Sequence, residues 1–188
     1  FAVTSPTQIL AEKNCERGED SVLPCHLFIK PDDSWAHVGT HIFKSVKGIP
    51  EHNLHEQVDP VNPCGFCGRA GCQIDLSGLP NARTTPKLVA GCSRAHTPFS
   101  YGHRKKSATP CTNVPILCML CPVIAPRKSP PVFWKYSMYP HIRVAHPQHW
   151  DDLLSRPMNL PADLALNIAI SREEMKALGA ISGLEMHR

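Results

Sequence analysis

The stretch that decides the fold runs from Cys118-Met-Leu-Cys121 to His141-Ile-Arg-Val-Ala-His146, in which two cysteines and then two histidines form close pairs. Zinc in proteins prefers four nitrogen or sulfur ligands in a tetrahedron, and a Cys-x2-Cys turn supplies two thiolates from one short segment. Nineteen residues separate the two pairs, whereas the usual two-Cys two-His finger has about a dozen. The ligand order therefore predicts a finger, with an extended, proline-containing connection filling the longer gap.

Around the histidine pair the sequence predicts a short helix from Ser137 to His146. Ser137 is expected to cap its start, and Pro140 falls in the first turn, where a missing amide hydrogen costs nothing. Pro147 ends the helix, because the residue before a proline disfavours helical geometry. Residues five apart diverge on a regular helix, so His146 is expected to turn back towards the metal. The alternative is a pair of surface histidines that bind nothing.

A second zinc site is predicted upstream, where cysteines outnumber the ligands that one site needs. Cys64 and Cys67 form another Cys-x2-Cys pair, and three more cysteines follow before the finger: Cys72, Cys92 and Cys111. Residues 72–77 alternate apolar and polar positions, which is typical of a strand and places Cys72 on an apolar face. A buried free cysteine behaves as a small hydrophobic side chain.

The choice among these cysteines follows from the expected hairpin. If residues 87–92 form the returning strand after a turn over residues 78–86, Cys92 comes back beside the Cys64–Cys67 turn. Cys72 is then spare, and His96 is an alternative ligand. We therefore expect this zinc to be bound by Cys64, Cys67, Cys92 and Cys111, and the second zinc by Cys118, Cys121, His141 and His146.

Four stretches resemble one family: WAHVGTHIFKSVKG at 35–48, PCGFCGRAGC at 63–72, PCTNVPILCMLCP at 110–122 and WKYSMYPHIRVAHP at 134–147. They are similar to cysteine-rich zinc-finger proteins of mushroom-forming fungi, over about residues 24–149. The last stretch alone resembles two-Cys two-His and BED-type fingers, which usually bind DNA. The resemblance implies two zinc sites and carries over no catalytic residue.

Charge is distributed unevenly along the chain. Between Asp75 and Asp151 there is no Asp or Glu but there are ten Lys and Arg residues, whereas residues 1–75 carry −4 and residues 151–188 carry −2. Two zinc ions and six thiolates would leave the middle segment near +8. Such a segment attracts polyanions, of which nucleic acid is the commonest. The alternative is a solvated basic face balanced by the acidic flanks.

The sequence thus favours a nucleic-acid-binding, and specifically DNA-binding, protein of the nucleus. We expect the basic loop formed by Arg104, Lys105 and Lys106 to face phosphate. Lys135 and Arg143 are expected to reach the groove. One alternative is a zinc-stabilised protein-interaction module of a chromatin or transposon assembly. A more remote one is a RING-like ubiquitin-ligase module, which needs a final Cys-x2-Cys where His141 and His146 stand.

Composition predicts a small irregular α+β fold, with zinc-stabilised fingers, short β-hairpins and short helices. With nineteen prolines and 6% aromatic residues in a chain of 188, we do not expect one large continuous core. A structural zinc contributes about 10–16 kcal/mol in small fingers. We expect an N-terminal α+β extension over 1–60, a double zinc-binding module over 61–150 and a helical segment over 151–188.

The two ends carry weaker signals. Leu160 to Ile170 is predicted to be helical, and Ser171-Arg172-Glu173-Glu174 has the form of a capping box that starts a helix ending before Gly179. We expect the apolar side of these helices to pack on the fingers; the alternatives are a partner protein and a second copy of the chain. Near the other end, five residues with irregular spacing offer a third metal site, which is the less favoured interpretation: Cys15, Cys25, His26, His37 and His41.

Catalysis is not expected. A catalytic zinc keeps one coordination position open and has a carboxylate nearby, whereas both predicted sites are closed and the middle segment lacks carboxylates. Nine cysteines could form disulfides in a secreted protein, but an odd number and Cys-x2-Cys pairs favour zinc in a reducing, intracellular compartment. No apolar run approaches the ~20 residues that cross a bilayer, so no membrane association is expected.

Overall fold

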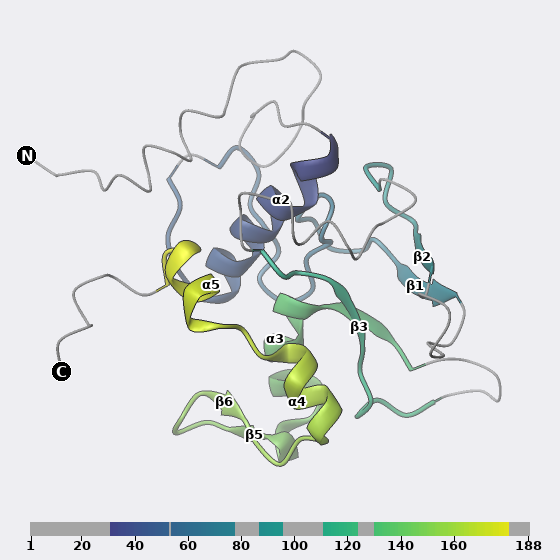
Figure 1. Cartoon of the computed structure of the whole chain (residues 1–188), viewed down its shortest axis with the longest axis vertical. Coiled ribbons are helices and arrows are strands. Elements are labelled where there is room, and N and C mark those ends of the chain that lie inside the picture. Colours follow the sequence, from purple (N-terminus) through teal and green to yellow (C-terminus); the bar gives the residue numbers. More distant parts are fainter. Residues whose placement is uncertain (1–30, 53, 78–86, 96–110, 124–129, 181–188) are drawn as a thin grey trace, which may run out of the picture.

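The computed structural model describes residues 31–52, 54–77, 87–95, 111–123 and 130–180 (Figure 1). Within them, three two-stranded antiparallel sheets are joined by short helices, which confirms the predicted small α+β fold. The elements in chain order are α2 (Pro31–Val46), β1 (Ile74–Ser77), β2 (Lys87–Ala90), β3 (Pro115–Leu117), β4 (Val132–Trp134), η2 (Lys135–Ser137), α3 (Met138–Ala145), η3 (Pro147–His149), β5 (Trp150–Asp151), β6 (Arg156–Pro157), α4 (Ala162–Ile168) and α5 (Arg172–Ala177).

The predicted hairpin is present as β1 and β2. Its register pairs Ile74 with Ala90 and Leu76 with Leu88. Side chains alternate between the two faces of a strand, and Leu88 is buried whereas Val89 is exposed. In β1 the residues at 74 and 76 are half-buried and those at 75 and 77 are exposed. The alternation predicted before the turn is therefore confirmed, and one face of this hairpin packs against the larger core.

The larger core lies between α2, the β1–β2 hairpin and the segment that follows β4. Phe43 of α2 meets Tyr136 edge-on, with ring centroids 5.3 Å apart, and Phe66 meets Trp134 in the same way at 5.1 Å. A Cβ atom on Gly65 would lie 2.4 Å from the Trp134 ring. Only glycine therefore fits where the backbone of the Cys64–Cys67 turn lies against that indole.

A smaller core lies between α3 and α4. Its buried members include Met138 and Ile142 of α3 and Leu164 and Ile168 of α4, which are spaced four apart in each helix and so share a face. The helix predicted from Leu160 is shorter than expected, because residues 161 and 169 on either side of it have non-helical backbone angles. In Figure 1, α4 lies over α3 and beside the β5–β6 hairpin.

The predicted capping box at the start of α5 is half confirmed. Ser171 Oγ accepts a hydrogen bond from the Glu174 amide at 3.1 Å, and the helix ends in a Schellman motif with Gly179 at φ 83°. The Glu174 carboxylate, however, does not complete the box. It is buried and accepts bonds from the Thr112 amide and hydroxyl, both at 2.6 Å, and from the Tyr136 hydroxyl.

These contacts join distant parts of the chain. The larger core contains Trp35, Cys64, Tyr136 and Leu178, and so draws on all three segments that the sequence suggested. Among the described residues, no helix is both long enough and apolar enough to cross a bilayer.

Replacing Glu174 by Ala should destabilise the fold, because the hydroxyls of Thr112 and Tyr136 would lose their carboxylate acceptor and the Thr112 amide would lose one of its two acceptors. We expect a loss of about 3 kcal/mol in the free energy of unfolding, since hydrogen bonds to charged groups are worth roughly 1.5–3 kcal/mol each and are not additive. Urea denaturation of the zinc-loaded protein measures this loss. Glu173→Ala, which removes an exposed neighbour, is the control; equal effects of the two changes would contradict the role of the buried carboxylate.

Candidate metal centres

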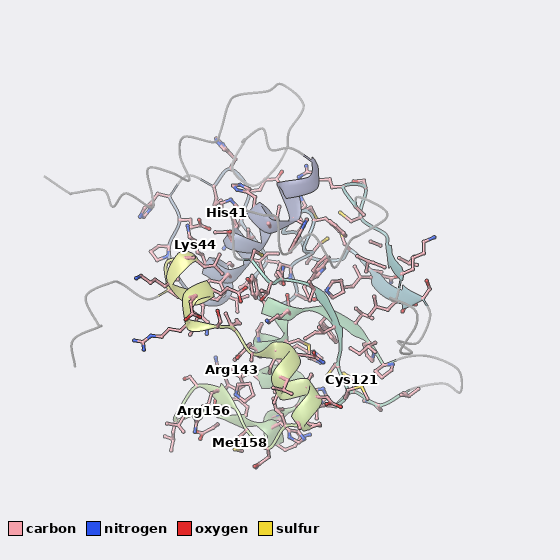
Figure 2. All side chains as sticks on the ribbon, viewed as in Figure 1. His41, Lys44, Cys121, Arg143, Arg156 and Met158 are labelled. Atoms are coloured by element: carbon pink, nitrogen blue, oxygen red, sulfur yellow. The ribbon has the colours of Figure 1, made fainter. Side chains whose placement is uncertain are left out.

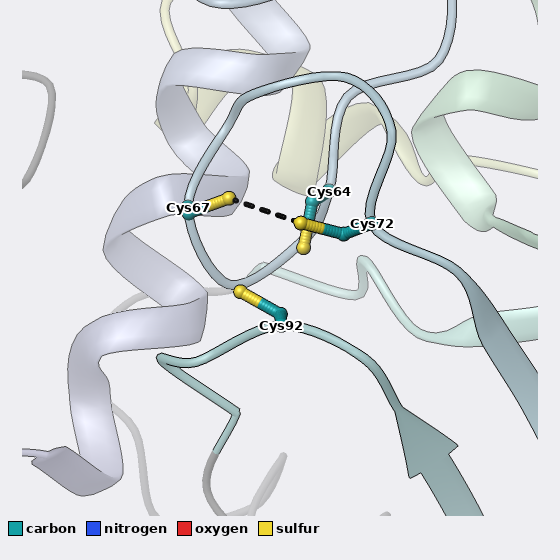
Figure 3. A group of neighbouring side chains, drawn as sticks. All are labelled: Cys64, Cys67, Cys72 and Cys92. Atoms are coloured by element: carbon teal, nitrogen blue, oxygen red, sulfur yellow. Dashed lines mark hydrogen bonds between the residues drawn. The ribbon is translucent and has the colours of Figure 1, made fainter.

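Four cysteines form the first candidate centre. The Sγ atoms of Cys64, Cys67, Cys72 and Cys92 all lie within 4.8 Å of one another (Figure 3). With Zn–S bonds of about 2.3 Å, a tetrahedron places its sulfur atoms about 3.8 Å apart, and the sulfurs of Cys67 and Cys72 are 3.7 Å apart. The cluster therefore has the ligand type, number and spacing to hold one zinc ion.

A tight turn supplies two of these ligands. The Gly68 amide donates to the Cys64 carbonyl at 2.7 Å, and Gly68 has a φ of 74°, which glycine adopts without strain. The Phe66 amide points at the Cys64 sulfur at 3.4 Å. Amides aimed at sulfur stabilise a thiolate, so the backbone of this turn is arranged for the charged form of the ligand.

The β1–β2 hairpin supplies the other two. Its pairing extends beyond the strands, because the Gly91 amide donates to the Gln73 carbonyl at 2.8 Å. One further step in this register places Cys72 opposite Cys92. Both sulfurs therefore come to the open end of the hairpin, next to the Cys64–Cys67 turn (Figure 3).

The structure differs from the sequence prediction in the fourth member of the cluster, because it brings Cys72 and not Cys111 to the other three cysteines. Cys111 is buried elsewhere, where its sulfur lies 3.6 Å from the Tyr136 hydroxyl oxygen. The sequence contained a signal for Cys72. In the expected hairpin, the residue that pairs with Cys92 is Cys72, so a hairpin that places Cys92 beside the turn also places Cys72 there. The alternative ligand His96 lies outside the described residues.

Hydrogen bonds between the thiols of this cluster shift their pKa values. A hydrogen bond from the Cys64 thiol lowers the pKa of Cys67, and backbone and neighbouring thiol donors add to that effect. The thiolate is the form that binds metal. A cluster that already favours one thiolate is suited to a cation. The seven cysteines that the structure describes are all free of disulfide bonds.

The second candidate centre is the predicted finger. Ligand atoms of Cys118, Cys121, His141 and His146 lie within 4.8 Å of one another. The Cys121 sulfur is 3.3 Å from Nε2 of each histidine, and the Cys118 sulfur is 3.6 Å from Nε2 of His146. Sulfur and nitrogen ligands of one tetrahedral zinc are separated by about 3.6 Å. This cluster can also hold one zinc ion, and all four predicted ligands are brought together.

The finger follows the order strand, Cys-x2-Cys turn, strand, helix. The Cys118 amide donates to the Pro131 carbonyl at 2.9 Å, which ties the turn to the chain entering β4. His141 lies within α3, and Phe133 of β4 stacks on its ring at a centroid distance of 3.8 Å. Burial lowers the pKa of His141 to about 4, so at neutral pH the ring is uncharged, as a metal ligand must be.

The helix end behaves as the sequence predicted, and its start does not. His146 follows the last helical residue, with φ −136° and ψ 58°, and this loosened turn brings its Nε2 back to the cysteines. Pro140 falls in the first turn as expected. Ser137, however, makes no side-chain capping bond, because its buried hydroxyl has no partner among the described residues.

Of the five residues expected to contact nucleic acid, the structure describes two. Arg143 is exposed, with 65% of its side chain accessible, and lies 3.9 Å from Asp152. Lys135 is only 6% exposed and donates to the Thr112 hydroxyl at 2.8 Å, so it is a core residue that does not reach a groove. Arg104, Lys105 and Lys106 lie outside the described residues.

No protein-family model, curated protein or solved structure matches the chain. The resemblance to fungal cysteine-rich finger proteins therefore stays a prediction from the sequence motifs.

Cys72→Ser should lower the zinc content of the purified protein by one ion, because the first cluster would lose one of four ligands. Cys111→Ser is the matched control and should leave the zinc content unchanged. Native mass spectrometry measures both. The reverse pattern, with zinc lost from the Cys111 variant alone, would mean that Cys111 and not Cys72 is the ligand.

Cys121→Ser should also release one zinc ion and unfold the smaller core, since a structural zinc supplies roughly 10 kcal/mol to a finger. Met119→Ser, an exposed change in the same turn, is the control. Amide NMR signals of α3 and α4 report the unfolding directly. A variant that kept all its zinc and these signals would remove Cys121 from the ligand set.

Proposed function

We propose that this zinc-binding protein binds nucleic acid, specifically DNA, through the basic segment that holds its metal ligands. The observation that carries the proposal is charge: residues 76–150 contain ten Lys and Arg and no Asp or Glu, and all four finger ligands and the helix α3 lie within this stretch. A dense positive charge draws the phosphate backbone by releasing its counterions.

The arrangement of the finger supports the proposal. Helix α3 has its buried side on the smaller core and exposes Arg143 and Val144. A single helix fits the major groove of DNA, which is about 12 Å wide. The pair between Arg143 and Asp152 does not oppose this role, because both side chains are largely exposed and such pairs are weak and readily exchanged for phosphate.

Zinc has a structural part in this proposal. Each cluster offers four protein ligands, and a site closed in this way has no position for a reacting water. The two ions would instead hold the turn, the hairpin and α3 in place. Phosphate contacts from the exposed cations fix the position of the protein on DNA without encoding sequence.

The test is a titration of random duplex DNA by fluorescence anisotropy across a salt series. The zinc-loaded protein should bind with an affinity that falls steeply with salt. Replacing Arg104, Lys105 and Lys106 together by Ala should weaken binding and flatten the salt dependence, and Arg143→Ala should lower the slope by about one unit.

Arg172→Ala is the matched control, because Arg172 is an exposed arginine outside the basic segment; it should bind as the unchanged protein does. Absence of salt-dependent binding by zinc-loaded protein would refute the proposal. Equal losses in the Arg143 and Arg172 variants would remove α3 from the interface.

A protein-interaction module is the second candidate, and apolar exposure favours it. Leu153 is 97% exposed, Leu166 75% and Val144 71%, and these residues lie on the elements around the second metal cluster.

The RING-like alternative has less support. Each cluster takes its ligands from neighbours in the sequence, whereas a RING is cross-braced, with alternate pairs sharing an ion.

A further inference from the structure

An open cleft borders the first metal cluster. The cleft has a volume of about 420 Å³, and its lining includes Cys67, Cys72 and Cys92. Cys72 is half-buried, and the other three cysteines of the cluster are buried. Three of the four ligand residues therefore lie at a surface that a small solute can enter, and Cys72 is the most accessible of them.

Cys67 and Cys72 are placed to react with each other. Their sulfur atoms are 3.7 Å apart (Figure 3), and four residues separate them in the sequence. Two of these four are Gly68 and Gly71, with φ of 74° and 85°, and a Cβ atom on Gly71 would meet nothing within 4 Å. Residues 69–71 are exposed. Because glycine is conformationally permissive, this loop can bring the two sulfurs to the roughly 2.05 Å of a disulfide bond.

The charge of the cluster makes its sulfurs reactive. One zinc ion with four thiolates is a dianion, whereas the two thiolates and two neutral imidazoles of the finger leave its ion neutral. The thiolate is the nucleophilic form of cysteine, and a thiolate that shares one cation with three others keeps more of its electron density. In the finger, Cys118 is fully buried and Cys121 packs against the smaller core (Figure 2). The first cluster is therefore the more readily oxidised of the two.

We propose that the first cluster is a redox switch, in which hydrogen peroxide joins Cys67 and Cys72 by a disulfide bond and the cluster loses its zinc ion. The Cys72 thiolate attacks an oxygen atom of the peroxide, which yields a sulfenic acid and one hydroxide. The Cys67 thiolate then attacks the Cys72 sulfur and displaces a second hydroxide. The two sulfurs lose two electrons, the peroxide gains them, and two protons from solvent convert both hydroxides into water.

The disulfide removes two of the four ligands, because its sulfurs are no longer thiolates and the thiolate is the form that binds metal. Cys64 and Cys92 alone cannot complete a tetrahedral site. Cys92, which follows β2, then loses its connection through the ion to the Cys64–Cys67 turn. The switch goes beyond the proposed nucleic-acid binding and does not depend on it.

The test adds hydrogen peroxide to the reduced, zinc-loaded full chain and counts zinc by native mass spectrometry. The count should fall from two to one, and the mass of the metal-free chain should fall by two hydrogen atoms. Trypsin cleaves after Arg69, between the two cysteines, so their peptides should stay joined, and fragmentation of the joined peptides should locate the bond at Cys67 and Cys72. Dithiothreitol with added zinc should restore both ions.

Ala70→Phe places a ring at the rim of the cleft, which the exposed Ala70 lines, and should slow the loss of zinc severalfold. Ala165→Phe, an exposed change on α4, is the matched control and should lose zinc as the unchanged protein does. Equal rates in the two variants would contradict entry of the oxidant through the cleft. A count that stays at two in excess peroxide would overturn the proposal, as would loss of zinc with a disulfide at any other pair of cysteines.

Discussion

Coordination of one ion by four side chains is the constraint on which this fold depends. The described strands are two to four residues long and pair only in twos, and an isolated two-stranded hairpin is marginal in water. Each metal cluster compensates by joining segments that would otherwise separate: the Cys64–Cys67 turn to the β1–β2 hairpin, and the Cys118–Cys121 turn to α3. Small cores then form around ligands that are themselves buried or partly buried, so metal binding and folding become one event.

Strand β4 packs against residues of both metal clusters. Its side chains alternate between two faces: Trp134 belongs to the larger core and meets Phe66 of the first cysteine turn, whereas Phe133 stacks on His141 of the finger. This three-residue strand therefore contributes side chains to both cores. The buried Glu174 adds a second connection, since it fastens α5 to the segment at Thr112 and to Tyr136 just beyond β4.

The features that could be predicted from the sequence are those that depend on interactions between neighbouring residues. The ligand pairs, the hairpin, the loosened turn at His146 and the start of α5 each depend on a few neighbouring residues. Register could have corrected the choice of Cys111 over Cys72, because pairing Ile74 with Ala90 also aligns residues 72 and 92. Nothing local, however, reveals that Lys135 turns inward or that Glu174 leaves its capping box. Those side chains are directed by partners at Thr112, which lies 23 and 62 residues away from them.

The same packing changes how the charge asymmetry should be interpreted. Along the sequence, ten cations form a block without carboxylates; in space, Glu174 of the acidic end is folded into that block, and Lys135 is buried beside Thr112. Burial removes Lys135 from any phosphate contact, while Arg143 stays accessible on α3. Since counterion release depends on cations that reach phosphate, the proposed binding of DNA would depend on the exposed members of the block rather than on its net charge.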